Sequence, residues 1–289
     1  MTKQIFNIKD LSHDWIPPLS NDKKLLEIRL DFFKNFNNET LKYITANYQD
    51  FIATFEKSIK ENKSMNISGL DLFNQKDVII GCQHFIDELI MTHGIDNIQL
   101  FDKGYNYYKK INPNIKYVTL DTLQSKKPLI LEYPFPKYLG EHPLYKDIIK
   151  KCNELDIDVY LDCAWLPASY GLTLDLDQPC IKGMAMSLSK CFGLHWSRIG
   201  VRWLKNETKD SIFHQNENRM ISLPNLMIGK YYLDRLPMDY LITKYQTKYY
   251  KICEKLSLNP GNIILASYSI DNKKLYGLKN LLLKNHEND

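Results

Sequence analysis

Short runs of apolar residues recur along the middle of the chain, and stretches with helical spacing separate several of them. The clearest helical stretch covers residues 144–155, where Ile148, Ile149, Cys152 and Leu155 fall on one face. Runs that are apolar on both faces and alternate with helices are typical of a mostly parallel sheet with helices on both faces, so the pattern predicts an α/β fold. The runs expected to form strands are 77–81, 97–101, 116–120, 128–133, 158–162, 183–187 and 199–204.

The two ends of the chain have a different pattern from the middle. A helix is expected from about residue 46, where Phe51, Phe55 and Ile59 recur every four residues. After Arg235 the spacing of apolar residues is helical again, and the last apolar run is 262–267. We therefore expect an N-terminal arm at residues 1–45, a large α/β domain at 46–235 and a reduced C-terminal small domain at 236–289.

Composition limits the class of protein. With 44% hydrophobic and 12% aromatic residues, a chain of 289 residues can bury a full core, which excludes a disordered polypeptide. The net charge of +4 rests on lysines spread along the chain and on only five arginines, which is typical of a solvated surface and not of a nucleic-acid-binding stripe. The first residues contain no apolar signal core and no run is long enough to span a membrane, so we expect a cytoplasmic protein that binds neither nucleic acid nor membrane. The six cysteines lack the close pairing of zinc sites, and we expect free core thiols and no metal site.

Residues 187–200, with the sequence SLSKCFGLHWSRIG, combine groups that suit a phosphate and an aldehyde. Two hydroxyls, Ser187 and Ser189, stand beside Lys190, and Arg198 follows eight residues after the lysine. Serine hydroxyls and a guanidinium bind a phosphate dianion, and a lysine amine forms a Schiff base with an aldehyde. The segment follows a predicted strand, and α/β folds place ligands at strand ends. A bare Ser-x-Ser-Lys is commonly a surface turn, but the arginine and the glycine after it favour a site.

This segment resembles the lysine signature of the fold-type I, class I/II aminotransferases, which use pyridoxal 5′-phosphate (PLP). By that resemblance Lys190 carries the cofactor as a Schiff base, and Ser187, Ser189 and Arg198 hold its phosphate. The resemblance also implies the large domain of a PLP-dependent transferase, with a shortened C-terminal small domain.

A second landmark of the family is an aspartate followed by x-Ala-Tyr at the end of a strand. The sequence DCAW matches it at Asp162 and Ala164, with Trp165 in place of the tyrosine. A carboxylate at this point faces the pyridine nitrogen and keeps it protonated, as PLP chemistry requires. An aspartate at a strand end is also a common turn former. Asp162 stands 28 residues before Lys190, a separation that the resemblance allows.

Two weaker landmarks of the family are also present. Gly81 permits a tight turn after the run 77–81, and the amides of Cys82 and Gln83 then open a helix towards an anion. Any junction of strand, glycine and helix looks similar, and a structural Cys82 is favoured over a reactive one. Tyr105 stands where family members carry the aromatic residue that stacks on the cofactor ring, with Tyr107 and Tyr108 competing for that role.

The turn after the run 128–133 departs from the family pattern. It lacks the asparagine that bonds the ring hydroxyl in the family, and Phe135 or Pro136 stands in its place. The indole N–H of Trp165 is an alternative donor. Trp196 occupies a position between the lysine and the arginine where glycine is common.

The C-terminal part departs from the pattern as well, because no arginine follows Arg235. The arginine with which the family grips the substrate α-carboxylate is therefore missing, and Arg29, Arg219, Arg235 or a lysine would have to replace it. For this reason we expect common amino acids to be poor substrates.

The resemblance implies a PLP-dependent enzyme, most simply an aminotransferase that acts on a small-molecule amino acid or amine. The alternatives are another PLP reaction on the same fold, such as that of a lyase, decarboxylase or cyclase, and a catalytically silent protein. A silent protein needs neither Lys190 nor Asp162, which disfavours that alternative. The resemblance also implies a homodimer, and the arm has aromatic residues that a monomer could hardly bury. These residues are Phe6, Trp15, Phe32, Phe33 and Phe36.

Overall fold

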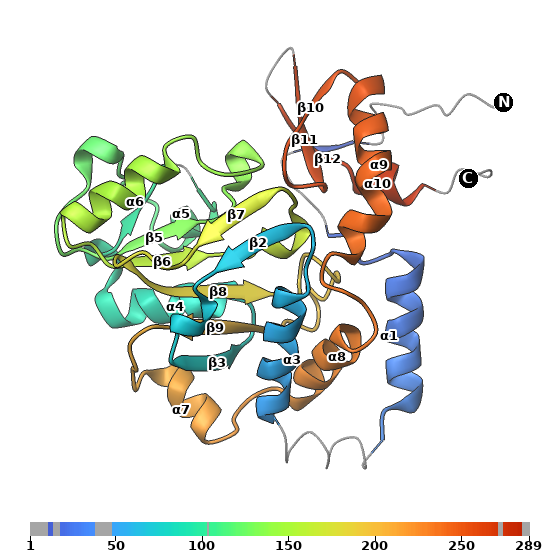
Figure 1. Ribbon diagram of the computed structural model, residues 1–289, viewed down its shortest axis with the longest axis horizontal. Coiled ribbons are helices and arrows are strands. Elements are labelled where there is room, and N and C mark those ends of the chain that lie inside the picture. Colours follow the sequence, from blue (N-terminus) through green and yellow to red (C-terminus); the bar gives the residue numbers. More distant parts are fainter. Residues whose placement is uncertain (1–10, 14–17, 38–47, 103, 271–273, 285–289) are drawn as a thin grey trace.

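The computed structural model describes residues 11–13, 18–37, 48–102, 104–270 and 274–284 of the chain. Its centre is a six-stranded sheet with the strand order β3-β9-β8-β6-β5-β4 (Figure 1). Strand β9 runs antiparallel to both of its neighbours, and the other three pairs are parallel, which confirms the mostly parallel sheet. The strands are β3 (Gln75–Ile79), β4 (Gln99–Leu100), β5 (Leu129–Glu132), β6 (Val159–Asp162), β8 (Ile181–Ser187) and β9 (Gly200–Leu204).

One predicted strand is wrong. The run 116–120 forms only a single bridge, between Val118 and Phe101, at the edge of the sheet beside β4. Pairing stops there because the chain turns into a 3₁₀ helix at Leu120–Thr122, whose capping box joins Thr119 and Thr122. The capping box of the 3₁₀ helix therefore prevents this apolar run from continuing as a strand.

Helices cover both faces of the sheet, as predicted. One face packs against α3 (Tyr48–Lys60), α6 (Tyr145–Glu154) and α8 (Leu223–Leu233). The other packs against α4 (Cys82–His93), α5 (Tyr107–Ile111) and α7 (Ser211–Glu217). Successive residues of a strand divide between the faces, so Leu131 lies in the cluster of α6 and Ile130 in that of α4. Helix α6 is the helix predicted at residues 144–155.

Two further strands, β2 (Met65–Ser68) and β7 (Leu172–Asp175), pair in parallel outside the main sheet. Buried and exposed residues alternate along β7, so neither strand has the continuous apolar run that marks the main sheet. This is why the sequence did not predict them.

The six cysteines are all buried and unpaired, as predicted. Burial raises the pKa of each thiol, most strongly at Cys82 and Cys163, which keeps the thiols protonated and unreactive. Among the described helices, none combines the length and the apolar character needed to cross a bilayer.

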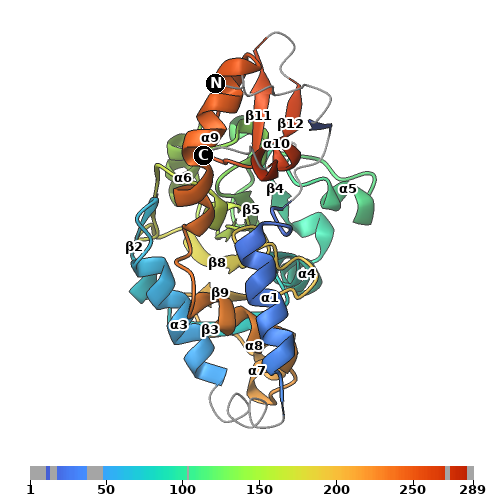
Figure 2. The same ribbon diagram turned by 90° about the vertical axis from the view of Figure 1, so that its right-hand side faces the viewer.

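The C-terminal segment forms a small antiparallel sheet with the N-terminal end of the chain. Strands β10 (Leu258–Pro260), β11 (Ala266–Ser269) and β12 (Leu275–Gly277) are joined by β1 (Ser12–His13), which pairs with β12. Helices α9 (Tyr240–Lys255) and α10 (Lys279–Leu283) accompany this sheet at one end of the molecule (Figures 1 and 2). The predicted run 262–267 contributes only its last two residues to β11.

The first long helix of the arm, α1 (Lys23–Asn35), lies beside α8 (Figures 1 and 2). Phe32 is buried and meets the ring of Tyr231 edge-on at 5.5 Å, whereas Phe33 is exposed. The other aromatic residues of the arm include Phe6 and Trp15, which lie outside the described residues.

A fully buried carboxylate, Asp22, caps α1 and ties it to α9. Its oxygens accept hydrogen bonds from the Leu25 amide at 3.1 Å, from Lys244 at 2.6 Å and from the hydroxyls of Tyr240 and Tyr245. Burial raises the pKa of Asp22, but the bonds from Lys244, Tyr245 and Leu25 outweigh burial and leave the pKa below its usual value. The ionised carboxylate therefore stabilises the fold.

Replacing Asp22 by asparagine should lower the free energy of unfolding by about 2 kcal/mol, because the charge-assisted bonds are lost. The pKa is lower in the folded than in the unfolded chain, so the contribution is present above the unfolded pKa and is lost as pH falls through the folded pKa. Urea unfolding of both proteins at neutral pH and at about pH 3 measures this difference. The exposed Asp71→Asn is the control, and equal losses from both substitutions at neutral pH would contradict the assignment.

Candidate active site

Three polar residues end three adjacent strands at one edge of the main sheet. Glu132 ends β5, Asp162 ends β6 and Ser187 ends β8. Glu132 and Asp162 are direct partners in the parallel register, and Asp162 is paired with Ala185, which lies two residues before Ser187. The carboxyl ends of parallel strands are where α/β folds bind ligands.

The loop from β8 to β9 carries the predicted lysine and closes tightly at its base. The Leu188 amide donates to the Ile199 carbonyl at 3.1 Å. Ser189 and Arg198 are the next residues on the two sides of the loop, so this bond brings their backbones together at the neck. Gly200 is required there, since a Cβ would lie 2.2 Å from the Met186 carbonyl oxygen. The loop tip is fixed from the arm by Arg29, whose Nη2 donates to the Gly193 carbonyl at 3.2 Å.

Gly81 and Arg198 form the end of the site that suits an anion. Gly81 has φ = 89° and precedes the first turn of α4, whose free amides include those of Cys82 and Gln83. A Cβ on Gly81 would lie 3.0 Å from Nη2 of Arg198, so the guanidinium lies directly against the start of the helix. Arg198 forms no ion pair with any carboxylate in the described part of the chain. A positive helix end beside a guanidinium without a carboxylate partner has the chemistry that suits a phosphate.

Lys190 lies half-buried, with its Nζ 4.1 Å from the centroid of the Trp165 ring. Burial lowers the pKa of Lys190 to about 8, and Arg198 adds to this effect, whereas Asp162 opposes it. A substantial fraction of the amine is therefore neutral near pH 8 and can attack an aldehyde. The structure brings Lys190, Asp162, Trp165 and Arg198 into one electrostatic environment.

Asp162 shares its surroundings with the thiol of Cys82. Burial raises the pKa of Asp162, while the Ala164 amide at 3.0 Å, the Cys82 thiol and Lys190 counteract the rise. The Cys82 sulfur also donates to the Ala185 carbonyl at 3.4 Å and lies beside the Ser187 hydroxyl. Cys82 is thus a buried support for Asp162 and not a nucleophile.

Of the three tyrosines predicted as ring-stacking candidates, Tyr105 has the position for that role. It is half-exposed, and its pKa is raised by burial and by Asp162 while Arg198 lowers it, so the charges of both site residues act on its hydroxyl. Tyr107 instead donates to Asp87 at 2.5 Å, and Gln83 faces the same hydroxyl. Tyr108 is buried in the core, and its hydroxyl has no hydrogen-bond partner in the described residues.

Several predicted replacements lie outside the site. Phe135 is buried with its ring centroid 5.1 Å from that of His142, so it offers no donor to a ligand. Trp196 is 82% exposed on the loop tip, and Arg235 stacks on the ring of Tyr231 at the surface. Of the arginines considered for a substrate carboxylate, Arg29 is the one that contacts the lysine loop.

The sequence missed Glu132 as a site residue. It is buried beside Asp162, and the Tyr105 amide donates to its carboxylate. The sequence feature that points to it is the glutamate at the end of the otherwise apolar run of β5, which a strand by itself does not require.

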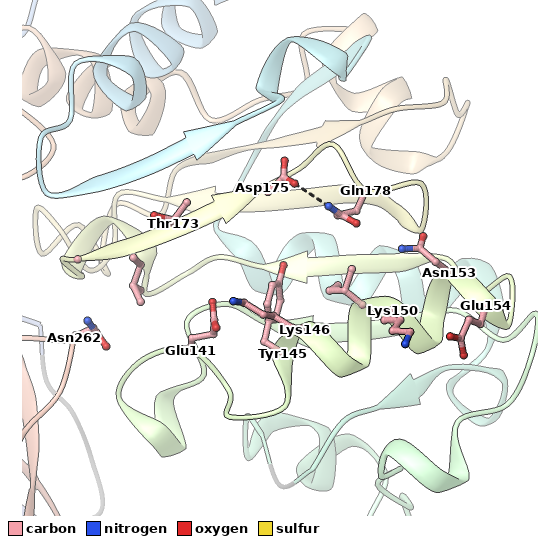
Figure 3. Close-up of a pocket in the computed structure, with 13 residues that line it drawn as sticks. Glu141, Tyr145, Lys146, Lys150, Asn153, Glu154, Thr173, Asp175, Gln178 and Asn262 are labelled. Carbon is pink, nitrogen blue, oxygen red and sulfur yellow. Dashed lines mark hydrogen bonds between the residues drawn. The ribbon is translucent and has the colours of Figure 1, made fainter.

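A hollow lies apart from this site, between α6 and β7. It has a volume of about 900 Å³ and is lined by polar side chains that include Tyr145, Lys146 and Asn262 (Figure 3). Gln178 donates to Asp175 at 2.8 Å at its edge. None of the predicted site residues lines it.

No protein-family model and no curated protein sequence matches this chain. Solved structures match its fold. The PLP-bound C-S lyase from Staphylococcus hominis superimposes with a TM-score of 0.60 and 11% identity over 88% of this chain and 73% of the lyase. A probable N-succinyldiaminopimelate aminotransferase from Thermus thermophilus has a TM-score of 0.57 and 14% identity, over 90% of this chain and 78% of the aminotransferase. L-threonine-O-3-phosphate decarboxylase from Porphyromonas gingivalis superimposes with a TM-score of 0.53 and 12% identity, over 79% of this chain and 81% of the decarboxylase.

The chain therefore has the fold that this lyase, this aminotransferase and this decarboxylase share. The resemblance drawn from the SLSK and DCAW segments is confirmed at the level of the fold. These structures carry out different reactions by name, so the fold leaves the reaction open.

Substitutions of Asp162 and of Arg198 should shift the pKa of Lys190 in opposite directions. Asp162→Asn removes a charge that raises the pKa of Lys190 and should move the midpoint of its acylation to lower pH. Arg198→Gln removes a charge that lowers this pKa and should move the midpoint to higher pH. Labelling with acetic anhydride across a pH series, read by peptide mass spectrometry, measures both midpoints. Lys57, whose side chain is 72% exposed, is the internal standard, and a shift of the same sign in both variants would contradict the described geometry.

Proposed function

We propose that this protein is a PLP-dependent enzyme whose cofactor lies between Lys190 and Asp162, with its phosphate at Arg198 and the start of α4. The observation that carries the proposal is the pairing of two kinds of subsite at one sheet edge. A lysine with a lowered pKa suits an aldehyde, and an unpaired guanidinium against Gly81 suits a phosphate dianion. PLP carries both groups on one ring.

Each residue has a role that follows from its position. PLP supplies an electron sink for a carbanion at the substrate α-carbon. Lys190 would hold the aldehyde through Nζ and could accept and return a proton at that atom. Asp162 would keep a proton on the pyridine nitrogen, and Trp165 packs against the lysine. Tyr105 would cover the ring.

The phosphate has its own set of donors. The guanidinium of Arg198 lies against the start of α4 and its amides, and Ser187 and Ser189 stand at the neck of the lysine loop, where their hydroxyls would add two further donors. Gly81 permits the approach, because a side chain there would meet the guanidinium.

Within this class, transamination of an amino acid or amine is the reaction we favour, with a lyase, decarboxylase or cyclase as the alternative. The solved structures of similar fold include enzymes named for transamination, C-S cleavage and decarboxylation. A catalytically silent protein is disfavoured, because it would have no need of a half-buried lysine whose pKa is lowered within the field of a half-buried aspartate.

We also propose a homodimer, and we keep the division into an arm, a large domain at 46–235 and a small domain at 236–289. Helix α1 exposes Leu26, Leu30 and Phe33, which recur along one face at helical spacing. Such a stripe is typical of an interface. Sedimentation of the PLP-loaded protein tests the dimer, and a species with the mass of one chain would contradict it.

Borohydride reduction after incubation with PLP should attach the cofactor to Lys190. Peptide mass spectrometry should find the label on this residue because the pKa of its half-buried amine is lowered to about 8. Lys190→Ala should lose both the label and the visible absorption of the bound cofactor. Label on another lysine in the wild-type protein would contradict the assignment.

A second variant separates the phosphate site from the lysine in the same experiment. Arg198→Gln should weaken PLP binding about tenfold or more, because a charge-assisted bond to the phosphate is lost. Pyridoxal without phosphate should lose much less affinity, because only the change in the pKa of Lys190 affects its binding. An equal loss for both ligands would show that Arg198 supports the fold and does not hold the phosphate.

Alanine, aspartate and glutamate should be poor amino donors for the PLP-loaded protein, because residues 236–289 offer no arginine to grip their α-carboxylate. Keto-acid formation with each donor measures transamination, and release of ammonia or carbon dioxide measures the alternatives. Efficient transamination of any of the three amino acids would show that another residue binds the carboxylate.

A further inference from the structure

Glu132 is a buried carboxyl group that the proposed roles above leave unused. It ends β5 directly beside Asp162 in the sheet register, and only 6% of its surface is exposed. Within the described residues it pairs with no lysine, arginine or histidine. Placing a second carboxyl group next to Asp162 without a cation is unfavourable unless one of the two stays neutral.

The turn that carries Tyr105 is folded around this carboxyl group. The Tyr105 amide donates to Glu132 Oε1, and a Cβ on Gly104 would lie 2.2 Å from the same oxygen. A side chain at Gly104 would push the carboxyl group away, so the backbone of the turn rests directly on Glu132. The beginning of the turn is held separately, because Asp102 accepts from Lys137 at 2.5 Å and from the Tyr138 hydroxyl at 3.0 Å.

The groups around Glu132 favour its neutral form. Asp162 faces it from β6, Asp102 from the end of β4, and the hydroxyls of Tyr105, Tyr108 and Tyr117 from the segment that follows. Burial raises the pKa of Glu132 to about 8, Asp162 and Asp102 add to the rise, and the Tyr105 amide opposes it. At neutral pH the edge of the sheet therefore carries the charge of Asp162 without a second carboxylate beside it.

We propose that Glu132 is a positioning residue for the cofactor: it holds Tyr105 over the ring through the backbone of the turn, and in its neutral form it leaves Asp162 as the one carboxylate at the ring. This inference rests on the proposed function. A ligand that covers the site removes the remaining water from Glu132, which makes its ionised form still more unfavourable. Ionisation of Glu132 therefore opposes cofactor binding.

Two variants separate the hydrogen bond from the charge. Glu132→Gln keeps an oxygen for the Tyr105 amide and cannot ionise, whereas Glu132→Ala removes both. Without any ligand, hydrogen exchange of the Tyr105 amide should be slow in the wild-type protein, fast in Glu132→Ala and slow again in Glu132→Gln. Fast exchange in Glu132→Gln, or slow exchange in Glu132→Ala, would overturn the positioning of the turn.

Cofactor binding is measured with 4′-deoxypyridoxine 5′-phosphate, which keeps the ring and the phosphate but has no aldehyde for Lys190. Between about pH 7 and pH 9 its dissociation constant should rise more steeply for the wild-type protein than for Glu132→Gln. The excess should be at most about tenfold per pH unit, the limit for one linked proton. Glu88→Gln, a buried glutamate of α4 that accepts from Ser211, is the matched control and should follow the wild-type profile.

The outcomes distinguish this inference from the proposed function. Binding with the same pH profile in the wild-type protein and Glu132→Gln would overturn the inference and leave PLP binding in place. Absence of binding to the wild-type protein at every pH would overturn both. A steeper profile for the wild-type protein and for Glu88→Gln than for Glu132→Gln supports the inference.

Discussion

The arrangement of the site depends on the register of three parallel strands. Because β5, β6 and β8 end together, Glu132, Asp162 and Ser187 reach the same sheet edge without any loop having to bring them there. A slip of one residue in β6 would turn Asp162 into the opposite face, where Leu161 packs in the core. Buried apolar side chains on both faces of these strands oppose such a slip, so the hydrophobic core also fixes the chemistry.

Close backbone approaches complete the site at positions where a side chain would not fit. Gly200 permits the closed neck of the lysine loop, Gly81 permits Arg198 to lie on the start of α4, and Gly104 permits the turn of Tyr105 to rest on Glu132. Each glycine joins a loop to a fixed strand or helix end. The flexible parts of the site are in this way attached to the rigid sheet, which is what preorganised binding requires.

Much of the fold and part of the site followed from the chain alone. Apolar runs located the strands of the main sheet, and the spacing of Ser187, Lys190 and Arg198 indicated a phosphate beside an amine. The strand predicted at 116–120 is wrong because the capping box at Thr119 begins a 3₁₀ helix there. Strand β1 was not predicted because a strand of two residues has no recognisable pattern. Glu132 was missed because its meaning depends on its neighbour across the sheet.

The sequence by itself determined which groups are available: one lysine among hydroxyls, one aspartate at a strand end and one arginine near a glycine. Tertiary structure decided their state. Burial lowers the pKa of Lys190 and raises those of Asp162 and Glu132, and the strand register places the two carboxyl groups side by side. Desolvation and through-space charge act between residues far apart in the chain, so no local pattern can encode them.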